Sequence, residues 1–426
     1  MKSIDCILWI CGFSCISVMA ADPGPAAEEL ASRRSLVASA LQDGVLVVEA
    51  GGAEGIEVSR DSEYLIGLRC EGAILAIDAG HDPPRSILFL PASDPSWERW
   101  HGPRASPGAA SQRATGVEET LPLAQFQQWM TQRLLPAGSL WRFSKERQLE
   151  PLWLEQVRRA GWKGKVHDAS EVVHPLRQIK SDWEVQQLEA AIERTEIGLR
   201  AGAAAARAGG NECQVESAIE AQFRRLGSPA PGFPSIVGSG QNNCCLHWMK
   251  NDGPIDSGDL LLMDVGARCG PYTADITRTV PIDGKWTDRQ REIYQVVWRA
   301  QQAGIAAVRV GATTRDVDAA ARAVIREAGY SEYFPHGTSH HVGMDVHDVG
   351  PFRNFQEGMV VTVEPGIYIP EEGFGIRIED MVVVTADGCR VLSAAIPKDP
   401  ESLARWCEKP KLDRSSSASP HTESKT

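Results

Sequence analysis

Basic residues are in short supply: 44 Lys and Arg stand against 56 Asp and Glu in 426 residues, for a formal net charge of −12. Proteins that bind the nucleic-acid backbone need a basic face, and proteins that adsorb to anionic membranes need a basic cluster. The charge balance therefore predicts no nucleic-acid partner. Glycine and proline, at 39 and 26 residues, are not in excess, which excludes collagen-like and disordered chains.

Cysteine pairs with the spacing of zinc or redox sites are missing as well, because no C-x-x-C motif occurs. An odd number of cysteines follows residue 20, scattered over the rest of the chain, and this is not a disulfide framework. We expect these cysteines to be small buried hydrophobic side chains. They are Cys70, Cys213, Cys244, Cys245, Cys269, Cys389 and Cys407.

Apolar runs long enough for several membrane spans are absent, and the run at residues 7–19 is short for even one, which needs about 20 residues. It follows Lys2 and ends in Val18-Met19-Ala20. This pattern predicts a secretory signal peptide at residues 1–20, cleaved near Ala20, and hence a periplasmic or secreted protein without a stable membrane span. An uncleaved N-terminal anchor is the alternative.

The length suggests two or three domains. Short apolar runs at 44–49, 73–78 and 86–90 predict strands, and they alternate with helical stretches at 123–135 and 149–160. This alternation predicts an N-terminal α/β domain over residues 30–175, and the block has no phosphate-cradling glycine loop to support a nucleotide role. A second domain is expected over 176–400, and the polar, Ser-rich residues 408–426 predict a disordered tail.

Capping boxes mark helices in the second domain. Ser181 with Glu184 predicts a helix that runs through Arg207, and Thr287 with Gln290 predicts another through about 309. A third helix is expected at 316–328. Strand pairs are expected between them, 259–267 with 274–281 and 360–369 with 375–385.

Acidic residues interrupt these predicted strands. Asp264 and Asp275 fall in the first pair, and Glu364 and Glu379 fall in the second. A buried carboxylate is costly unless it is paired or bound to a metal. Buried salt bridges to Arg278 and Arg377 are the structural alternative, but two arginines cannot easily neutralise four carboxylates.

A metal pair balances this charge. Two divalent cations carry +4, four carboxylates carry −4, and the neutral imidazole of His340, in the string 336–348 (HGTSHHVGMDVHD), adds nothing. Oxygen ligands with one histidine favour Mn²⁺, with Fe²⁺, Co²⁺ or Zn²⁺ as alternatives. Two such ions about 3.5–4 Å apart lower the pKa of a shared water and stabilise a tetrahedral intermediate.

These residues, in this order and in these strings, resemble the pita-bread metallopeptidases, and within them the Xaa-Pro aminopeptidases (aminopeptidase P). The resemblance covers about residues 40–400 and is strongest from 176 to 385. The strings that carry it are 236–240 (IVGSG), 275–280 (DITRTV), 284–294 (GKWTDRQREIY), 336–348, 363–368 (VEPGIY) and 375–380 (GIRIED).

The resemblance implies a fold and a metal site. The fold class is α/β (α+β), with an N-terminal creatinase-like α/β domain followed by a pita-bread catalytic domain. The implied ligands of two divalent ions, with Asp275 and Glu379 bridging them, are Asp264, Asp275, His340, Glu364 and Glu379. A homodimer is also the family expectation.

The implied reaction is release of the first residue from peptides with proline in second position, by attack of a metal-bridging hydroxide on the scissile carbonyl. The implied catalytic residues are His247 and His347, which contact the carbonyl or oxyanion, and Glu364, which handles the proton. On the substrate side, His336 helps line the proline pocket and Tyr368 lies near the substrate. Arg377 holds a carboxylate ligand there.

Several alternatives stay open from sequence. An Xaa-Pro dipeptidase (prolidase) shares the fold and ligands, whereas creatine hydrolysis on this fold runs without metal and methionine aminopeptidases generally lack the N-terminal block. A non-catalytic pita-bread binding module is the rival of another class. His341 is expected to be a packing neighbour rather than a ligand, and Asp345 and Asp348 either orient His347 or cap a turn.

Overall fold

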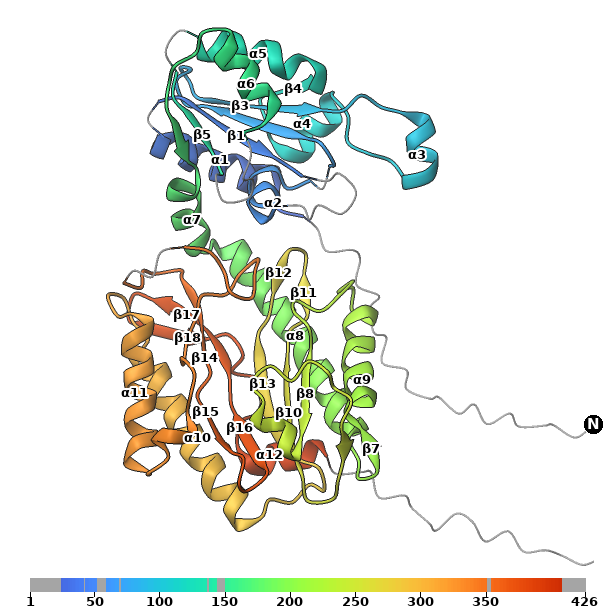
Figure 1. Ribbon diagram of the computed structural model, residues 1–426, viewed down its shortest axis with the longest axis vertical. Helices are drawn as coiled ribbons and strands as arrows, with labels where there is room; N and C mark the ends of the chain where they lie inside the picture. Colours follow the sequence, from blue (N-terminus) through green and yellow to red (C-terminus); the bar gives the residue numbers. More distant parts are fainter. Residues whose placement is uncertain are drawn as a thin grey trace, which may run out of the picture.

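The computed structural model describes residues 24–41, 43–51, 59–68, 70–135, 138–143, 150–350 and 354–407. The predicted signal peptide at 1–20 and the predicted tail at 408–426 lie outside the described residues. Within the described ranges, no helix combines the length and apolar character that a membrane span requires. The chain forms an N-terminal unit and a C-terminal unit, one above the other in Figure 1.

The N-terminal unit is built on a six-stranded mixed sheet with the order β4-β3-β2-β1-β5-β6. Its strands are β1 (Val45–Glu49), β2 (Ile74–Asp78), β3 (Arg85–Leu90), β4 (Glu119–Pro122), β5 (Leu140–Arg142) and β6 (Val166–Asp168). Its helices are α1 (Ala27–Leu41), α2 (Arg60–Ile66), α3 (Pro95–His101), α4 (Ala109–Thr115), the 3-10 helix η1 (Leu123–Gln125), α5 (Phe126–Leu134), α6 (Leu152–Arg159) and α7 (Ser170–Gln178).

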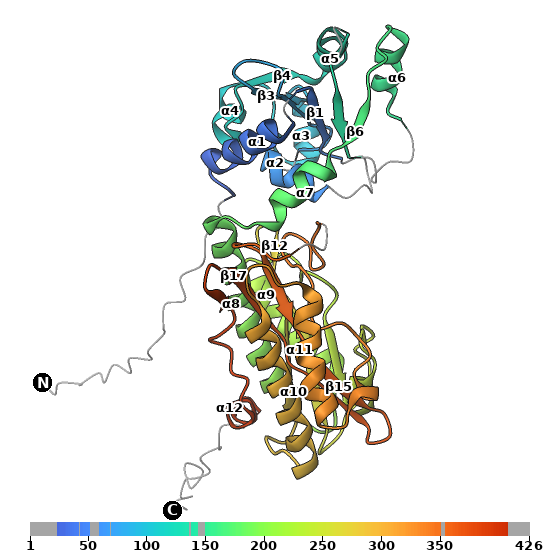
Figure 2. The ribbon, with the colours of Figure 1, turned by 90° about the vertical axis from the view of Figure 1, so that its left-hand side faces the viewer.

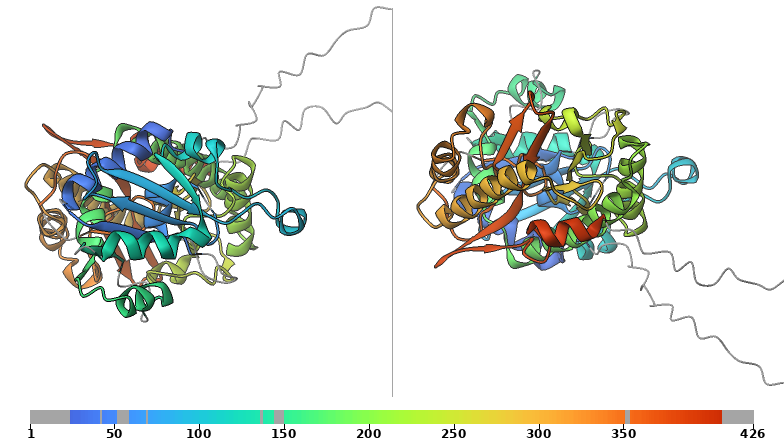
Figure 3. Two further views of the ribbon diagram at one scale, coloured as in Figure 1. Left: turned by 90° about the horizontal axis from the view of Figure 1, so that it is seen from above. Right: turned by 90° about the horizontal axis from the view of Figure 1, so that it is seen from below.

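Helices cover both faces of this sheet, as the view from above in Figure 3 shows. Because successive side chains of a strand point to opposite faces, β1 contributes to two cores. Val47 packs in the core that α5 and α6 complete, while Leu46 belongs to the core that includes Val37 of α1 and Leu65 of α2. The three predicted strands of this domain are confirmed as β1, β2 and β3.

The C-terminal unit holds its helices outside curved sheets ordered β13-β10-β8, β14-β17-β18 and β15-β16. Its strands are β7 (Gly210–Asn211), β8 (Ile236–Ser239), β9 (Pro254–Ile255), β10 (Leu260–Val265), β11 (Arg268–Cys269), β12 (Tyr272–Thr273), β13 (Ile276–Pro281), β14 (Val360–Val363), β15 (Gly366–Ile369), β16 (Phe374–Arg377), β17 (Asp380–Thr385) and β18 (Gly388–Val391). Its helices are α8 (Asp182–Ala205), α9 (Glu212–Arg225), η2 (Gly240–Cys244), α10 (Asp288–Ala307), α11 (Thr314–Glu327), η3 (Ser331–Tyr333) and α12 (Pro400–Trp406).

Side-chain caps begin the long helices of this unit. Both predicted capping boxes are present, Ser181 with Glu184 at α8 and Thr287 with Gln290 at α10. The helices pack in two pairs, α8 against α9 and α10 against α11, and the second pair lies side by side in Figure 2. Gly198 of α8 permits close approach of α9, because a Cβ there would lie 2.4 Å from Phe223 Cε1.

Both predicted strand pairs are confirmed. β10 pairs antiparallel with β13, and Asp264 lies opposite Thr277. The second pair divides into β14 with β17 and β15 with β16, so the expected long hairpin is two short ladders. Together the expected α/β architecture, an N-terminal α/β unit followed by a pita-bread unit, is confirmed.

The expectation for the cysteines was wrong in part. Cys70, Cys269 and Cys407 are buried, but Cys213 and Cys245 are exposed. Cys213 lies in the first turn of the amphipathic helix α9, on its solvent side, where a small side chain has nothing to pack against. The seven cysteines after residue 20 are all free thiols.

Candidate metal centre

Two carboxylates of the centre come from the β10–β13 pair. Asp264 is the last but one residue of the buried strand β10 and lies across the ladder from Thr277. Asp275 precedes Thr277 by two residues, and residues two apart on an extended chain project from the same face. Asp264 and Asp275 are therefore brought to one face of the sheet, where both are buried.

Two more carboxylates come from the second strand system. Glu364 follows β14, and Glu379 lies between β16 and β17. The two systems are joined at the site: the Glu379 amide donates to the Thr277 carbonyl at 3.2 Å, and the Thr277 hydroxyl donates to Glu379 Oε2 at 2.7 Å. Residues about 100 apart in sequence thus meet, as the sequence predicted for these four acidic residues.

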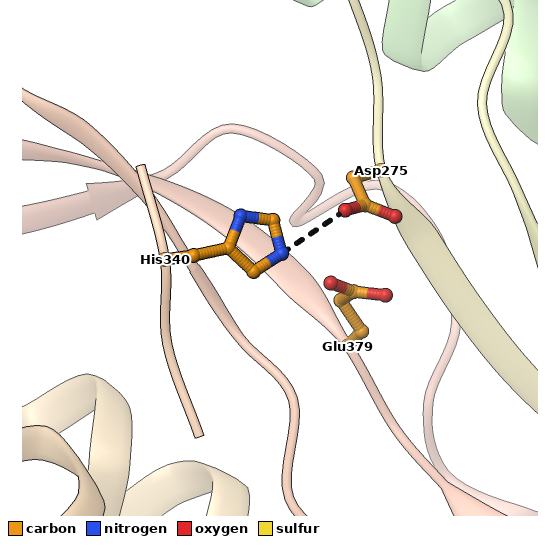
Figure 4. A group of neighbouring side chains, drawn as sticks. All are labelled: Asp275, His340 and Glu379. Atoms are coloured by element: carbon orange, nitrogen blue, oxygen red, sulfur yellow. Dashed lines mark ion pairs between the residues drawn. The ribbon is translucent and has the colours of Figure 1, made fainter. Parts of the chain in front are cut away.

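His340 completes the cluster shown in Figure 4. Its backbone is held by Thr362, whose amide donates to the His340 carbonyl at 2.9 Å. Its Nδ1 lies 3.0 Å from the His341 carbonyl, which can only accept, so Nδ1 carries the proton. The free Nε2 then faces Asp275 Oδ2 and Glu364 Oε1, each at 3.4 Å. That is the tautomer a metal-ligating histidine requires.

The carboxylates of this cluster repel one another and lack enough positive charge nearby to balance them. Burial and the neighbouring Asp264 and Glu364 raise the pKa of Asp275 well above its usual value. Burial, Asp275 and Glu364 do the same to the pKa of Glu379, and burial raises that of Glu364. Asp264 Oδ1 and Glu379 Oε1 are buried without a hydrogen-bond partner. Bound cations would remove the repulsion and satisfy both oxygens.

The donor set fits a divalent metal. One ligand atom each from Asp275, His340 and Glu379 lies within 4.8 Å of the others. Carboxylate oxygens with one imidazole suit Mn²⁺ and its neighbours among the divalent ions. Both the types of ligand atom and their spacing therefore suit a divalent metal ion.

Arg377 orients one of the carboxylates. Its Nη2 donates to Asp264 Oδ2 at 2.8 Å and its Nη1 donates to the Tyr368 hydroxyl at 2.8 Å. The Tyr368 hydroxyl lies 2.8 Å from His336 Nε2 and donates to it, because His336 Nδ1 is engaged with the Gly337 carbonyl. Burial and the charge of Arg377 lower the pKa of His336 to about 4, so this ring is neutral at neutral pH.

A cavity of about 440 Å³ opens onto the cluster. Its wall contains nine of the ten predicted site residues: His247, Asp264, Asp275, His336, His340, His347, Glu364, Arg377 and Glu379. The tenth, Tyr368, is buried behind the wall, where its hydroxyl serves Arg377 and His336. The rest of the lining is Gly337, Ser339 and six apolar side chains, namely Phe233, Pro234, Ile236, Leu246, Met249 and Val346.

Two histidines, His247 and His347, line this cavity but are not among the predicted metal ligands. The His347 ring centroid lies 4.3 Å from that of His340, and His247 is exposed on the segment that follows η2. Burial lowers the pKa of His347. Both rings can therefore offer N–H donors to a substrate oxygen from outside the carboxylate cluster.

Asp345 and Asp348 were expected either to orient His347 or to cap a turn, and the structure shows both of them in ion pairs. Both pair with Arg177, and Asp348 also pairs with Lys180. Neither contacts the His347 ring through a hydrogen bond in the described residues. His341 is buried and packs edge-on against Phe355, as expected for a packing neighbour.

Thr277 is a site residue that sequence reasoning missed. Its hydroxyl donates to Glu379 Oε2 and accepts from Arg377 Nε at 3.2 Å. The signal was present in the string 275–280 (DITRTV), since a residue two positions after a ligand on a strand shares its face.

Thr277→Val should lower activity or metal affinity about 10- to 100-fold, because it removes the hydroxyl that orients Glu379. Thr277→Ser keeps the hydroxyl and should stay close to wild type. Metal titration and steady-state kinetics of both variants test this. Equal behaviour of the two would show that the hydroxyl does not hold Glu379.

Comparison with known proteins places this centre in a family. Profiles of metallopeptidase family M24 and of the aminopeptidase P N-terminal domain match residues 186–386 and 30–141. The Xaa-Pro aminopeptidase of Escherichia coli is 31% identical over 88% of this chain and 96% of its own. The Xaa-Pro dipeptidase of Pyrococcus furiosus is 36% identical over 52% of this chain and 65% of its own. Zinc-substituted E. coli aminopeptidase P with product aligns with TM-score 0.82 and 29% identity, over 90% of this chain and 98% of that one.

The fold, the buried carboxylates and these matches define a metallopeptidase of the pita-bread class. Within that class, the chain belongs to metallopeptidase family M24 and, by the match of both of its units, to the aminopeptidase P group. The resemblance seen in the sequence is confirmed.

Proposed function

We propose that this protein is an exported Xaa-Pro aminopeptidase that uses two divalent ions per chain, with Mn²⁺ preferred. One observation carries the proposal: four carboxylates, three of them buried, and one histidine converge on an open cavity. Burial and mutual repulsion raise the pKa values of Asp275 and Glu379, and burial raises that of Glu364, as expected for ligands of a cation. Full-length similarity to Xaa-Pro aminopeptidases supports the reaction.

The residues that would hold the ions are Asp264, Asp275, His340, Glu364 and Glu379. When bound, the metal pair supplies an activated water as nucleophile and neutralises charge that develops on the scissile carbonyl. Arg377 fixes the orientation of Asp264, and Thr277 fixes that of Glu379. Glu364 takes up a proton at its carboxylate and delivers it to the leaving nitrogen of proline.

Proline needs a shaped pocket because its amide nitrogen has no N–H for backbone recognition. His336 is suited to line such a pocket, since its ring is neutral and is held by Tyr368. His247 and His347 are placed to donate to the substrate carbonyl or oxyanion from the cavity wall.

Xaa-Pro dipeptidase activity is the second candidate, supported by the 36% identity to the dipeptidase of P. furiosus. A dipeptide presents a free carboxylate directly after its proline, and a buried carboxylate requires a cationic partner. Among the described residues that line the cavity, Arg377 is the only lysine or arginine, and Asp264 already engages it. This favours longer peptides over dipeptides.

Export follows from residues 1–20, which have the composition of a signal peptide. We also propose a homodimer, as the family resemblance implies. Fractionation of expressing cells and sequencing of the mature N-terminus test export. A chain that keeps Met1 in the cytosol would contradict it.

The reaction is tested with mature protein stripped of metal and reloaded with Mn²⁺. The substrates are Arg-Pro-Pro, Gly-Pro and a peptide matched to the first with Ala in second position. Release of arginine from Arg-Pro-Pro alone is expected. Cleavage confined to Gly-Pro would assign a dipeptidase, and two bound ions without any cleavage would indicate a binding module.

His247→Ala should keep both metal ions and lower kcat about 10²- to 10³-fold, as loss of an oxyanion donor does in other enzymes. The His247 side chain is exposed and, among the described residues, makes no hydrogen bond to a ligand carboxylate, so the fold should be unaffected. Metal analysis and measurement of kcat on the same variant distinguish a loss of metal ions from a loss of the oxyanion donor. An unchanged kcat would show that His247 has no part in the reaction.

A further inference from the structure

The segment that carries His347 is a closed loop. The Asp348 amide donates to the His341 carbonyl at 2.9 Å, so residues 341–348 begin and end at the same point. The base of the loop is tied to neighbouring strands, because the Val342 amide donates to Val360 and the Thr273 amide donates to the Gly343 carbonyl at 2.9 Å. His347 directly precedes Asp348, the residue that closes the loop, and Asp345 lies two positions before it.

Both acidic residues that flank His347 are held by one guanidinium. Arg177 Nη2 donates to Asp348 Oδ1 at 2.7 Å and to Asp345 Oδ2 at 3.3 Å. Its Nη1 donates to Asp61 Oδ1 at 2.7 Å. Arg177 belongs to α7 and Asp61 to α2, so the contact joins the N-terminal unit to the loop of the catalytic unit.

The contact is deeply buried. The side chains of Arg177 and Asp348 are 2% and 1% exposed, and Lys180 Nζ donates to the second oxygen of Asp348 at 3.1 Å. Burial opposes ionisation of Asp348, but Lys180 and Arg177 outweigh it and hold the pKa of its carboxyl below the usual value. Buried, paired charges of this kind have few alternative arrangements, so they fix the loop in one place.

His347 depends on this loop for its position. Its ring makes no hydrogen bond to any described residue, although it lines the cavity beside His340. The backbone therefore sets where the ring stands, and the backbone on both sides of it is anchored through Asp345 and Asp348.

We infer that Arg177 is a positioning residue that fixes His347 at the cavity through Asp345 and Asp348, and that Asp61 couples this position to the docked N-terminal unit. The inference rests on the proposed function in giving His347 a part in turnover. The inference itself rests on geometry, because the guanidinium group of Arg177 bonds with three carboxylates that belong to two different units. A lysine keeps the charge but cannot span them.

The decisive variant is Arg177→Lys, measured alone and with His347→Ala. We expect Arg177→Lys to lower kcat about 10- to 100-fold through misplacement of His347, with a smaller change in KM and unchanged metal content. Because Arg177 acts through His347, it should cost nothing further once His347 is alanine. Asp61→Asn should lower kcat less, since Arg177 keeps Asp348.

Arg133→Lys is the matched control. Arg133 forms a similar two-pronged pair with the buried Asp78, but within the N-terminal unit. It should lower thermal stability and leave kcat unchanged. In protein with ¹³C-labelled histidine, the ring signal that His347→Ala removes should shift in Arg177→Lys and stay in place in Arg133→Lys.

Three results would overturn the inference. They are an unmoved His347 signal in Arg177→Lys, equal kcat losses from Arg177→Lys with and without His347, or a kcat loss in Arg133→Lys as large as that in Arg177→Lys. Failure of the proposed function looks different, since wild-type protein would then cleave no Xaa-Pro peptide. The histidine signal tests the positioning role in that case too.

Discussion

Glu364→Gln and Asp264→Ala should each reduce peptide hydrolysis by at least about 10⁴-fold, because either change removes a carboxylate from the proposed metal centre. Enzymes accelerate their reactions by about 10⁶-fold or more, and the proposed metal pair would supply much of this acceleration by activating a water. Glutamine at position 364 keeps the shape of the side chain but loses its charge and its capacity to accept a proton. Steady-state kinetics and metal analysis of the purified variants measure both losses.

The two variants differ in their effect on stability. Asp264 pairs with Arg377, so Asp264→Ala leaves a buried guanidinium without its partner, which costs about 3–5 kcal/mol in comparable cases. Glu364→Gln breaks no pair with an arginine and should fold normally. Asp259→Asn is the control and should be fully active. Asp259 directly precedes β10, the strand of Asp264, but it accepts a hydrogen bond from the Ser239 hydroxyl and does not line the cavity. Wild-type turnover in Glu364→Gln would refute the metal-centre assignment.

Asp275→Asn should abolish activity and yet make the metal-free protein more stable than the wild type. Burial, Asp264 and Glu364 hold the pKa of Asp275 well above its usual value. The folded wild type therefore binds more protons than the unfolded chain, and its free energy of unfolding falls as pH rises above about 4. Asparagine has no such titration. The stability difference should be small at pH 4 and grow in favour of the variant toward neutral pH.

Denaturant unfolding in a chelator, at a series of pH values, measures this difference. Added Mn²⁺ should reverse its sign, because the metal stabilises the folded wild type by mass action and the variant binds it poorly. Asp348→Asn offers a contrast, since Lys180 and Arg177 hold the pKa of that carboxyl low and its loss should destabilise the protein at neutral pH. If metal-free Asp275→Asn unfolds more easily than the wild type at neutral pH, the proposed repulsion between Asp275 and the neighbouring carboxylates is wrong.

The acidic site residues were predictable because the sequence places charged side chains directly after apolar residues of buried strands. Asp264 follows four consecutive apolar residues, and Glu364 follows a strand-like run, residues 360–363 (VVTV), in which three of four residues are apolar. Capping boxes at Ser181 and Thr287 are local patterns, and they gave the starts of α8 and α10 correctly. Signals of this kind need no knowledge of distant contacts.

Other features depend on contacts that sequence does not display. Helix α1 escaped prediction because Arg33 and Arg34 are buried on its inner face, where their guanidinium groups donate to carbonyls of α2. The role of Thr277 depends on Glu379, 102 residues away, and the network of Arg177 depends on two separate units. The resemblance places Tyr368 near the substrate, but only the structure shows that its hydroxyl bonds with Arg377 and His336.

The hydrogen bond between Thr277 and Glu379 spans 102 residues, and it brings the two strand systems together at the metal centre. An unfolded chain consequently offers only scattered carboxylates, each too weak a chelator to compete for ions. Tight coordination begins only when both halves of the catalytic unit have docked, so metal uptake reports the completion of folding. With the export proposed above, the chain would cross a membrane before it folds. It would then draw its ions from the compartment it enters, and metal supply there would set how much active enzyme accumulates.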